Sequence, residues 1–207
     1  MTPTTIKTGP DPMATRTAVD DALRADTYAL LGSLLAAPPG QDLLDWLADL
    51  EVDAGDGSRL ADAWQTLSVA AGDAIAGDVL DEFQQLFVGL GKGEIVPYGS
   101  WYRTGYLMEQ PLVELRADLR RLGLEADPES HEPEDHVAAL CEVMSLLLRP
   151  GENFAREHGR NFHERHLKAW CIRFFEDLRV CPSARFYRAV GGFGAVFMGV
   201  EALRLEA

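Results

Sequence analysis

A short run near the middle of the chain combines carboxylates with an imidazole. The run is Glu-Pro-Glu-Asp-His over 132–136, and an apolar stripe at helical spacing follows it. Pro133 suits the first position of a helix, because its missing N–H would have no helical partner there. We therefore expect a helix over 133–148 with Glu132 as its N-cap. Carboxylates near a helix start are also favoured by the helix dipole, so on spacing alone capping is favoured over a binding site.

His136 exceeds what capping requires. A cation near a helix N-terminus is disfavoured, so we expect a neutral imidazole unless Asp135 or Glu132 holds its proton. His136 stands one turn before Leu140, on the border of the apolar stripe. Carboxylates and an imidazole would then meet an apolar groove at one helix end. Such a site can clamp a cationic or amide-bearing segment.

A second segment, 89–102, is rich in glycine and aromatic residues and has no helical period. Gly89, Gly91 and Gly93 resemble a phosphate-binding run. No strand precedes them and no G-K-[ST] follows, which disfavours nucleotide binding. An apolar loop on a helical scaffold is a common place for partner contact. The alternative is a structural loop whose aromatic side chains pack into the core.

Other chemistry has less support in the residues. His163 and His166 have the i,i+3 spacing of metal ligands on one helix face, but no carboxylate or cysteine stands at a matching step. We expect capping and surface contacts from them instead. The three cysteines fit no disulfide framework or paired metal spacing, and no G-x-S-x-G motif occurs. The chain is thus expected to bind rather than catalyse. A metal- or nucleotide-dependent hydrolase using Asp135 and His136 is the alternative.

The elements that must position these residues are helices. Apolar residues recur at steps of three and four from about residue 19 onward, and no alternation is long enough for a strand. We predict an all-α bundle of about nine or ten helices over 17–207, after a disordered leader at 1–16. The acidic connector 124–132 is expected to join two lobes, 17–123 and 133–207.

The composition limits the partners. The net charge is −14, with 19 basic against 33 acidic residues, which argues against nucleic acid and favours a basic partner. The longest apolar runs are far shorter than the ~20 residues of a membrane span, so no membrane insertion is expected. The polar N-terminal residues and the unpaired cysteine pattern predict a cytoplasmic protein.

In order and in motifs the chain resembles the TorD/DmsD family of cytoplasmic chaperones for molybdenum oxidoreductases. Residues 86–102 are similar to the family's loop of the form F-x-G…P-[WY]-[GE]-S-x-[YW], and 132–144 to its E-P-x-D-H-x-x-x-L-x-x-x-M signature. Later helices match at 166–174 and 186–188. The likeness covers about 24–205, in the N-terminal third by helical pattern only. The run Gly-Lys-Gly at 91–93 departs from it, since relatives often have a Pro-rich stretch there.

The resemblance implies a TorD-like fold and a function without catalysis. Such chaperones bind the twin-arginine signal peptide, the apo form, or both, of an oxidoreductase of the DMSO/TMAO reductase or formate dehydrogenase type. They hold it until the molybdopterin cofactor is inserted and export is permitted; whether this client is exported stays open. No cofactor of the chaperone's own is implied, although relatives have been suggested to bind guanine nucleotide weakly. The long connector 124–132 can act as a hinge for domain swapping, so a monomer and a domain-swapped dimer are both compatible with the sequence.

The resemblance also implies which residues contact the peptide. Glu132, Asp135 and His136 are expected at its polar end. The apolar groove is expected to consist of Pro97, Tyr98, Ser100, Trp101, Tyr102 and Leu140.

Overall fold

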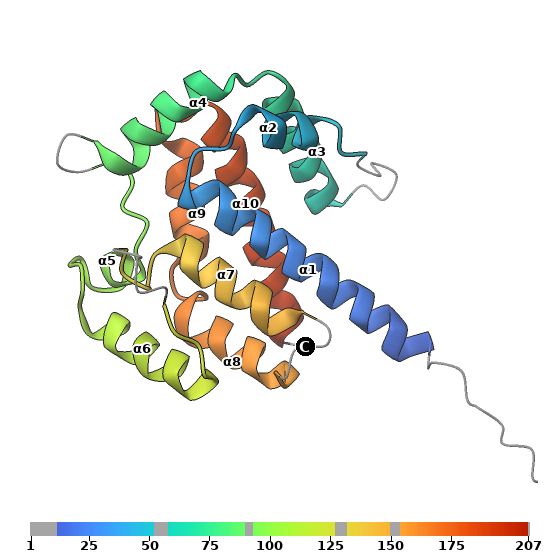
Figure 1. Ribbon diagram of the computed structural model, residues 1–207, viewed down its shortest axis with the longest axis vertical. Coiled ribbons are helices and arrows are strands. Elements are labelled where there is room, and N and C mark those ends of the chain that lie inside the picture. The colour runs from blue at the N-terminus through green and yellow to red at the C-terminus, as the bar shows by residue number, and fades with distance from the viewer. Residues whose placement is uncertain (1–11, 52–57, 90–92, 127–131, 150–153, 207) are drawn as a thin grey trace, which may run out of the picture.

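The computed structural model describes residues 12–51, 58–89, 93–126, 132–149 and 154–206 (Figure 1). Over these ranges the chain forms ten α-helices, one π-helical turn and no named strand, which confirms the all-α prediction. The helices are α1 (Pro12–Ala36), α2 (Gln41–Ala48), α3 (Arg59–Gly72), α4 (Ala76–Phe83), α5 (Gly99–Thr104), α6 (Gln110–Leu122), α7 (Val137–Leu148), α8 (Arg156–His166), α9 (Cys171–Val180) and α10 (Phe186–Glu206); the π-helical turn is η2 (Gln84–Val88). In this part of the chain no helix is long and apolar enough to cross a membrane.

Helix α1 begins earlier than the sequence predicts. Its first residue is Pro12, so the prediction of a disordered leader is wrong for residues 12–16. Residues 1–11 of that leader lie outside the described residues. Proline is favourable at a first helical position, and the methionine and alanine that follow are good helix formers.

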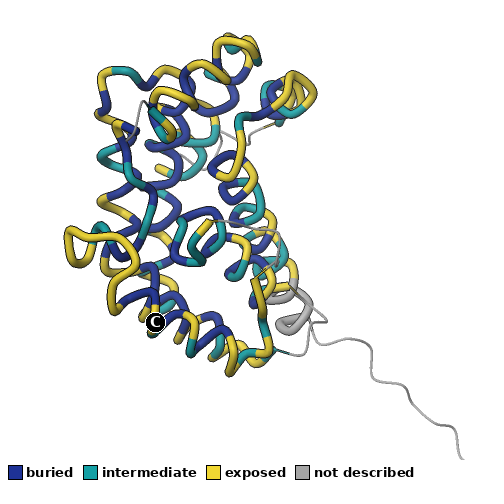
Figure 2. The backbone as a smooth tube through the Cα atoms, turned by 60° about the vertical axis from the view of Figure 1, so that its left-hand side comes forward, coloured by how far each residue is buried: buried dark blue, intermediate teal, exposed yellow. Residues whose placement is uncertain are grey.

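The helices enclose one core. Helix α1 packs along α7, and α10 packs along both α3 and α9 (Figure 1). Buried positions run through the interior from the N-terminal to the C-terminal half (Figure 2). The predicted division into lobes 17–123 and 133–207 is therefore wrong. Helix α1 buries the apolar stripe of α7, although the sequence-based prediction places these two helices in different lobes. Residues 127–131 of the predicted connector lie outside the described residues.

Close contact between α9 and α10 depends on glycine. A Cβ atom added at Gly191 would lie 2.6 Å from the backbone nitrogen of Arg179, and one at Gly194 would lie 2.2 Å from the ring of Phe175. Any other residue would push the two helices apart.

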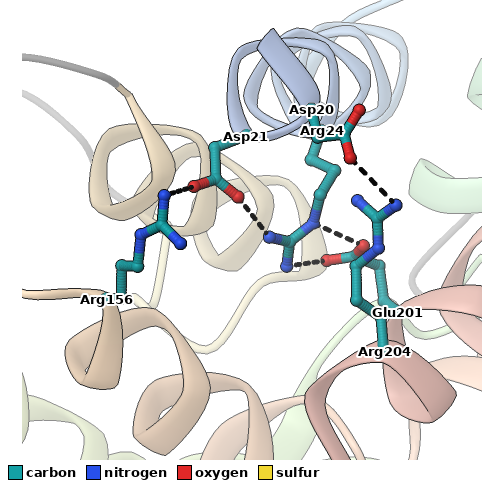
Figure 3. Close-up of polar contacts among 6 residues, drawn as sticks. All are labelled: Asp20, Asp21, Arg24, Arg156, Glu201 and Arg204. Atoms are coloured by element: carbon teal, nitrogen blue, oxygen red, sulfur yellow. Dashed lines mark hydrogen bonds and ion pairs between the residues drawn. The ribbon is translucent and has the colours of Figure 1, made fainter. Parts of the chain in front are cut away.

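A buried ion pair joins the first helix to the last (Figure 3). The Arg24 guanidinium of α1 donates two hydrogen bonds of 2.7 Å to the Glu201 carboxylate of α10. Asp21 contacts both Arg24 and, at 3.2 Å, Arg156 of α8. Glu201 is only 1% exposed, so its charge depends on the guanidinium for compensation.

Candidate functional site

Helix α7 begins four residues later than the sequence predicts. Its N-cap is His136, whose Nδ1 accepts a hydrogen bond of 3.2 Å from the backbone N–H of Ala138. The prediction of Glu132 as N-cap with Pro133 in the first turn is therefore wrong. Residues 133–136 form a turn instead, in which the His136 N–H donates to the Pro133 carbonyl at 3.0 Å.

The backbone explains this late start, because the turn binds to segment 97–100 from earlier in the chain. The Gly99 N–H donates to the Asp135 carbonyl at 2.9 Å, and the Val137 N–H donates to the Pro97 carbonyl at 2.8 Å. These bonds make an isolated antiparallel bridge between residues 98 and 136. The two motifs that carry the family resemblance thus meet in space.

The buried side chain of Asp135 stabilises the same contact between the two segments. Its Oδ2 accepts a hydrogen bond of 2.7 Å from the Ser100 N–H, in the first turn of α5, where backbone N–H groups have no helical partner. Asp135 is 3% exposed, and its Oδ1 has no hydrogen-bond partner among the described residues. The carboxylate therefore orders the start of α5. This helix also corrects the prediction that the chain is irregular through residue 102.

Tyr98, Glu132 and His136 form the solvent-facing part of the site. The Tyr98 hydroxyl donates to the Glu132 carboxylate, and the Tyr98 ring meets the His136 ring edge-on, with centroids 5.1 Å apart. Burial and the bond to Glu132 raise the pKa of Tyr98, while burial lowers the pKa of His136. The imidazole is therefore neutral near pH 7. Because Nδ1 accepts a bond, Nε2 carries the proton and is a donor.

A cavity of about 510 Å³ opens beside these three side chains. Its walls come from the end of α1, from α4 and η2, and from α7. The apolar part includes Leu35, Phe83, Phe87, Val88, Pro97 and Val143, and the acidic part includes Glu125, Glu132, Glu134 and Glu142. No lysine or arginine lines it among the described residues. Glu134 is paired with Arg116 at 2.8 Å, so the other three glutamates give the cavity its negative charge.

Three predicted contact residues are buried and do not line this cavity. Ser100 is 0%, Asp135 3% and Leu140 1% exposed. Their burial does not favour direct contact with a peptide in this cavity, so that contact stays a prediction. They lie beneath the segments that carry Tyr98 and His136, two residues that line the cavity.

Two further predicted residues face a different cavity. Trp101 and Tyr102 line a space of about 560 Å³ together with residues of α9. The Tyr102 ring stacks on Trp170 at 5.5 Å between centroids, and its hydroxyl donates to Asp177 at 3.0 Å. Of the nine predicted residues, the structure gathers Pro97, Tyr98, Glu132 and His136 around the first cavity.

The residues of α4 and η2 that form one wall of the cavity were not among the predicted contact residues. Phe83 and Phe87 are four residues apart and have the spacing of ordinary core positions. Glu142 is the one charged residue of α7, on the side away from its buried stripe, and is the available signal because a carboxylate on a largely apolar helix needs a polar opening. The sequence does not show that α4 and η2 lie opposite α7.

His163 and His166 are buried, at 2% and 4% exposure, so the expectation of surface contacts is wrong. His166 Nε2 lies 2.8 Å from Asp118 Oδ2 of α6. Within the described ranges no group of three or more histidine, cysteine or carboxylate side chains is placed to hold a metal ion. The sequence separation between α6 and α8 conceals this pairing.

The described helices form an all-α bundle with a cavity that has an apolar part and an acidic part, and comparison with known proteins identifies the family. Residues 53–176 match the family described as nitrate reductase delta subunit. The chain belongs to this family, that of the TorD and DmsD proteins. It is a family of chaperones, not of enzymes.

Individual relatives agree with this assignment. The chaperone protein TorD of Histophilus somni is 29% identical over 110 residues, which cover 53% of this chain and 55% of that protein. TorD of Actinobacillus succinogenes is 28% identical, over 45% and 47%. The Tat proofreading chaperone DmsD of Salmonella typhi is 29% identical over 179 residues, or 81% and 83%. The chain thus spans about half the length of these two TorD relatives and most of DmsD.

Proposed function

We propose that this chaperone binds the twin-arginine signal peptide of a molybdenum-containing oxidoreductase in the cavity beside Tyr98, Glu132 and His136. One observation carries the proposal: the cavity joins an apolar wall to glutamates, and none of the described residues that line it is a lysine or arginine. A twin-arginine signal peptide (the leader peptide of the client) has two arginine guanidiniums followed by an apolar run. Guanidinium groups form strong charge-assisted hydrogen bonds with carboxylates, and the apolar run is buried along the wall.

The client in this proposal is the apo form of an enzyme of the DMSO/TMAO reductase or formate dehydrogenase type. The chaperone holds it in the cytoplasm until its cofactor is inserted. It needs no cofactor of its own, and it acts as a monomer or a domain-swapped dimer. The name of the Salmonella relative, a Tat proofreading chaperone, supports the export pathway in this proposal.

A peptide titration tests the proposal. The probe is a fluorescent peptide with two arginines followed by about ten apolar residues. We expect Glu132→Gln and Glu142→Gln each to weaken its binding about tenfold, because each removes a carboxylate from the cavity. The fold is retained, since both glutamates are exposed.

The matched control is Glu157→Gln. Glu157 is exposed on α8 and does not line the cavity, so this change removes the same charge elsewhere. We expect it to leave affinity within about twofold, as for a distant screened charge. Equal losses in all three variants would show that the peptide is attracted by net charge alone, and the cavity assignment would fail.

A further inference from the structure

Helix α4 and η2 present an exposed apolar ridge that continues the cavity. Val88 lines the cavity and is 51% exposed. Leu80 is 43% exposed and lies two turns earlier on the same face, because helix positions about four apart are neighbours. Ile75, directly before α4, is 64% exposed. We call the exposed side chains of residues 75, 80 and 88 the α4 ridge.

Carboxylates border the α4 ridge. The Gln41 side chain at the start of α2 accepts a hydrogen bond of 3.0 Å from the Ala76 N–H and donates one of 2.8 Å to Asp45. These bonds place the acidic face of α2 beside the start of α4, where the two helices are neighbours in Figure 1. Asp78 and Asp81 of α4 are also exposed. Neither helix contains a lysine or arginine.

Exposed aliphatic side chains that adjoin a binding cavity are a mark of partner contact. The charged side chains of α2 and α4 are all acidic, so these two helices favour a basic partner over an acidic one. From residue 75 to residue 88 the ridge covers 13 residue steps of cap, α-helix and π-helical turn, roughly 20 Å at the α-helical rise of 1.5 Å per residue. An extended peptide covers that length with about six residues.

We propose that the α4 ridge binds the stretch of client chain that directly follows the part held in the cavity, and that this stretch is apolar with basic residues. The inference rests on the proposed function, because it concerns the next segment of the same client chain. With the arginines at Glu132, the apolar run lies along the cavity toward Phe87 and Val88. The chain then leaves the cavity along α4.

Two probe peptides test the inference. The short probe has two arginines and about ten apolar residues, and the long probe adds six residues in which leucine and lysine alternate. The long probe binds the full chain about tenfold more tightly than the short one, as burial of two or three aliphatic side chains allows. The double variant Ile75→Ser/Leu80→Ser removes this gain and leaves the affinity of the short probe unchanged.

The matched control is Val113→Ser/Val180→Ser, which removes aliphatic side chains that are 56% and 63% exposed on α6 and α9. It keeps the gain of the long probe. The inference is overturned if the long probe gains nothing over the short one, if the ridge variant keeps the gain, or if the control loses it too. Failure of the proposed function looks different. In that case the short probe is insensitive to Glu132→Gln, while the comparison of the two probes still decides the role of the ridge.

Discussion

At the scale of single residues, Asp135 serves a surface site from a buried position. Its carboxylate accepts from the Ser100 N–H at 2.7 Å and its carbonyl from the Gly99 N–H at 2.9 Å. Both bonds hold segment 97–100 against the turn that precedes α7. Because Tyr98 lies within this segment, its approach to Glu132 depends on Asp135.

Replacing Asp135 by alanine lowers the free energy of unfolding by about 2 kcal/mol, the size of a lost hydrogen bond to a charged group. Asp135→Asn keeps an oxygen acceptor, so its loss is smaller. Urea denaturation of both variants measures these differences. An alanine variant as stable as the original chain would contradict the anchoring role of this carboxylate.

Stability also depends on pH through the buried histidines. Burial lowers the pKa values of His136, His163 and His166 from 6.5. Below pH 6.5 the unfolded chain binds protons that the folded chain does not, so stability falls with pH down to the folded pKa values and is level above 6.5. Denaturation at pH 7.5, 6.5 and 5.5 measures this trend. Stability that stays constant or rises toward pH 5.5 would contradict it.

The sequence singles out His136 because capping needs no imidazole, and the family resemblance adds Glu132 as a predicted contact residue. It does not show the direction in which the side chains point. Whether Asp135 faces the cavity or the core is decided by bonds to residues 99 and 100, some 35 positions earlier. A helical period reports the face of one helix and carries no information on such a distant partner.

At the scale of elements, glycines decide how closely α10 approaches α9. Gly191→Ala places a Cβ atom 2.6 Å from the Arg179 nitrogen, and backbone cannot yield as a side chain can. We expect a loss of about 1–3 kcal/mol in the free energy of unfolding, as for other overpacked sites. Thermal unfolding followed by circular dichroism measures it.

Gly199→Ala is the matched control on the same helix. A Cβ atom there meets nothing within 4 Å, so the higher helix propensity of alanine stabilises the chain by up to about 1 kcal/mol. Opposite signs for the two changes are the expected result. Equal effects would mean that propensity alone, and not the approach to α9, governs both positions.

Helices over long apolar periods are predictable because that signal is local. The end of α6 at Gly123, with φ of 72°, follows from the preference of glycine for this conformation. The starts of α5 and α7 are not local, because hydrogen bonds between the two segments determine them. The single core was also not predictable, because an acidic connector marks a loop and does not reveal which helices pack together.

At the scale of the whole molecule, the Arg24–Glu201 pair ties the two ends of the fold. Arg24→Met leaves the Glu201 charge buried without its guanidinium, so we expect a loss of about 3–5 kcal/mol. Changing both residues to leucine restores most of it, because no unpaired charge remains. Chemical denaturation of the single and double variants measures both effects.

The neighbouring pair in Figure 3 provides a control. Asp20 and Arg204 lie 3.7 Å apart and are 47% and 45% exposed. Arg204→Met therefore changes stability by less than about 1 kcal/mol. A loss equal to that of Arg24→Met would show that total charge on the helix ends, rather than burial, controls stability.

The net charge of the whole molecule determines the electrostatic field around it. A net charge of −14 attracts any basic peptide, so affinity alone does not locate the site. A specific contact between two charged groups is distinguished from general electrostatic attraction by substituting both groups, singly and together. This calls for a pairwise test at Glu132.

The most direct measurement is a double-mutant cycle between Glu132 of the chaperone and the arginine pair of the leader peptide. Calorimetric titrations give the four affinities of original and Glu132→Gln chaperone with original and Arg→Gln peptide. We predict a coupling energy of about 1–3 kcal/mol, as for close charge pairs across an interface. A coupling energy near zero, with each change weakening binding independently, would contradict the assignment of this cavity as the leader site.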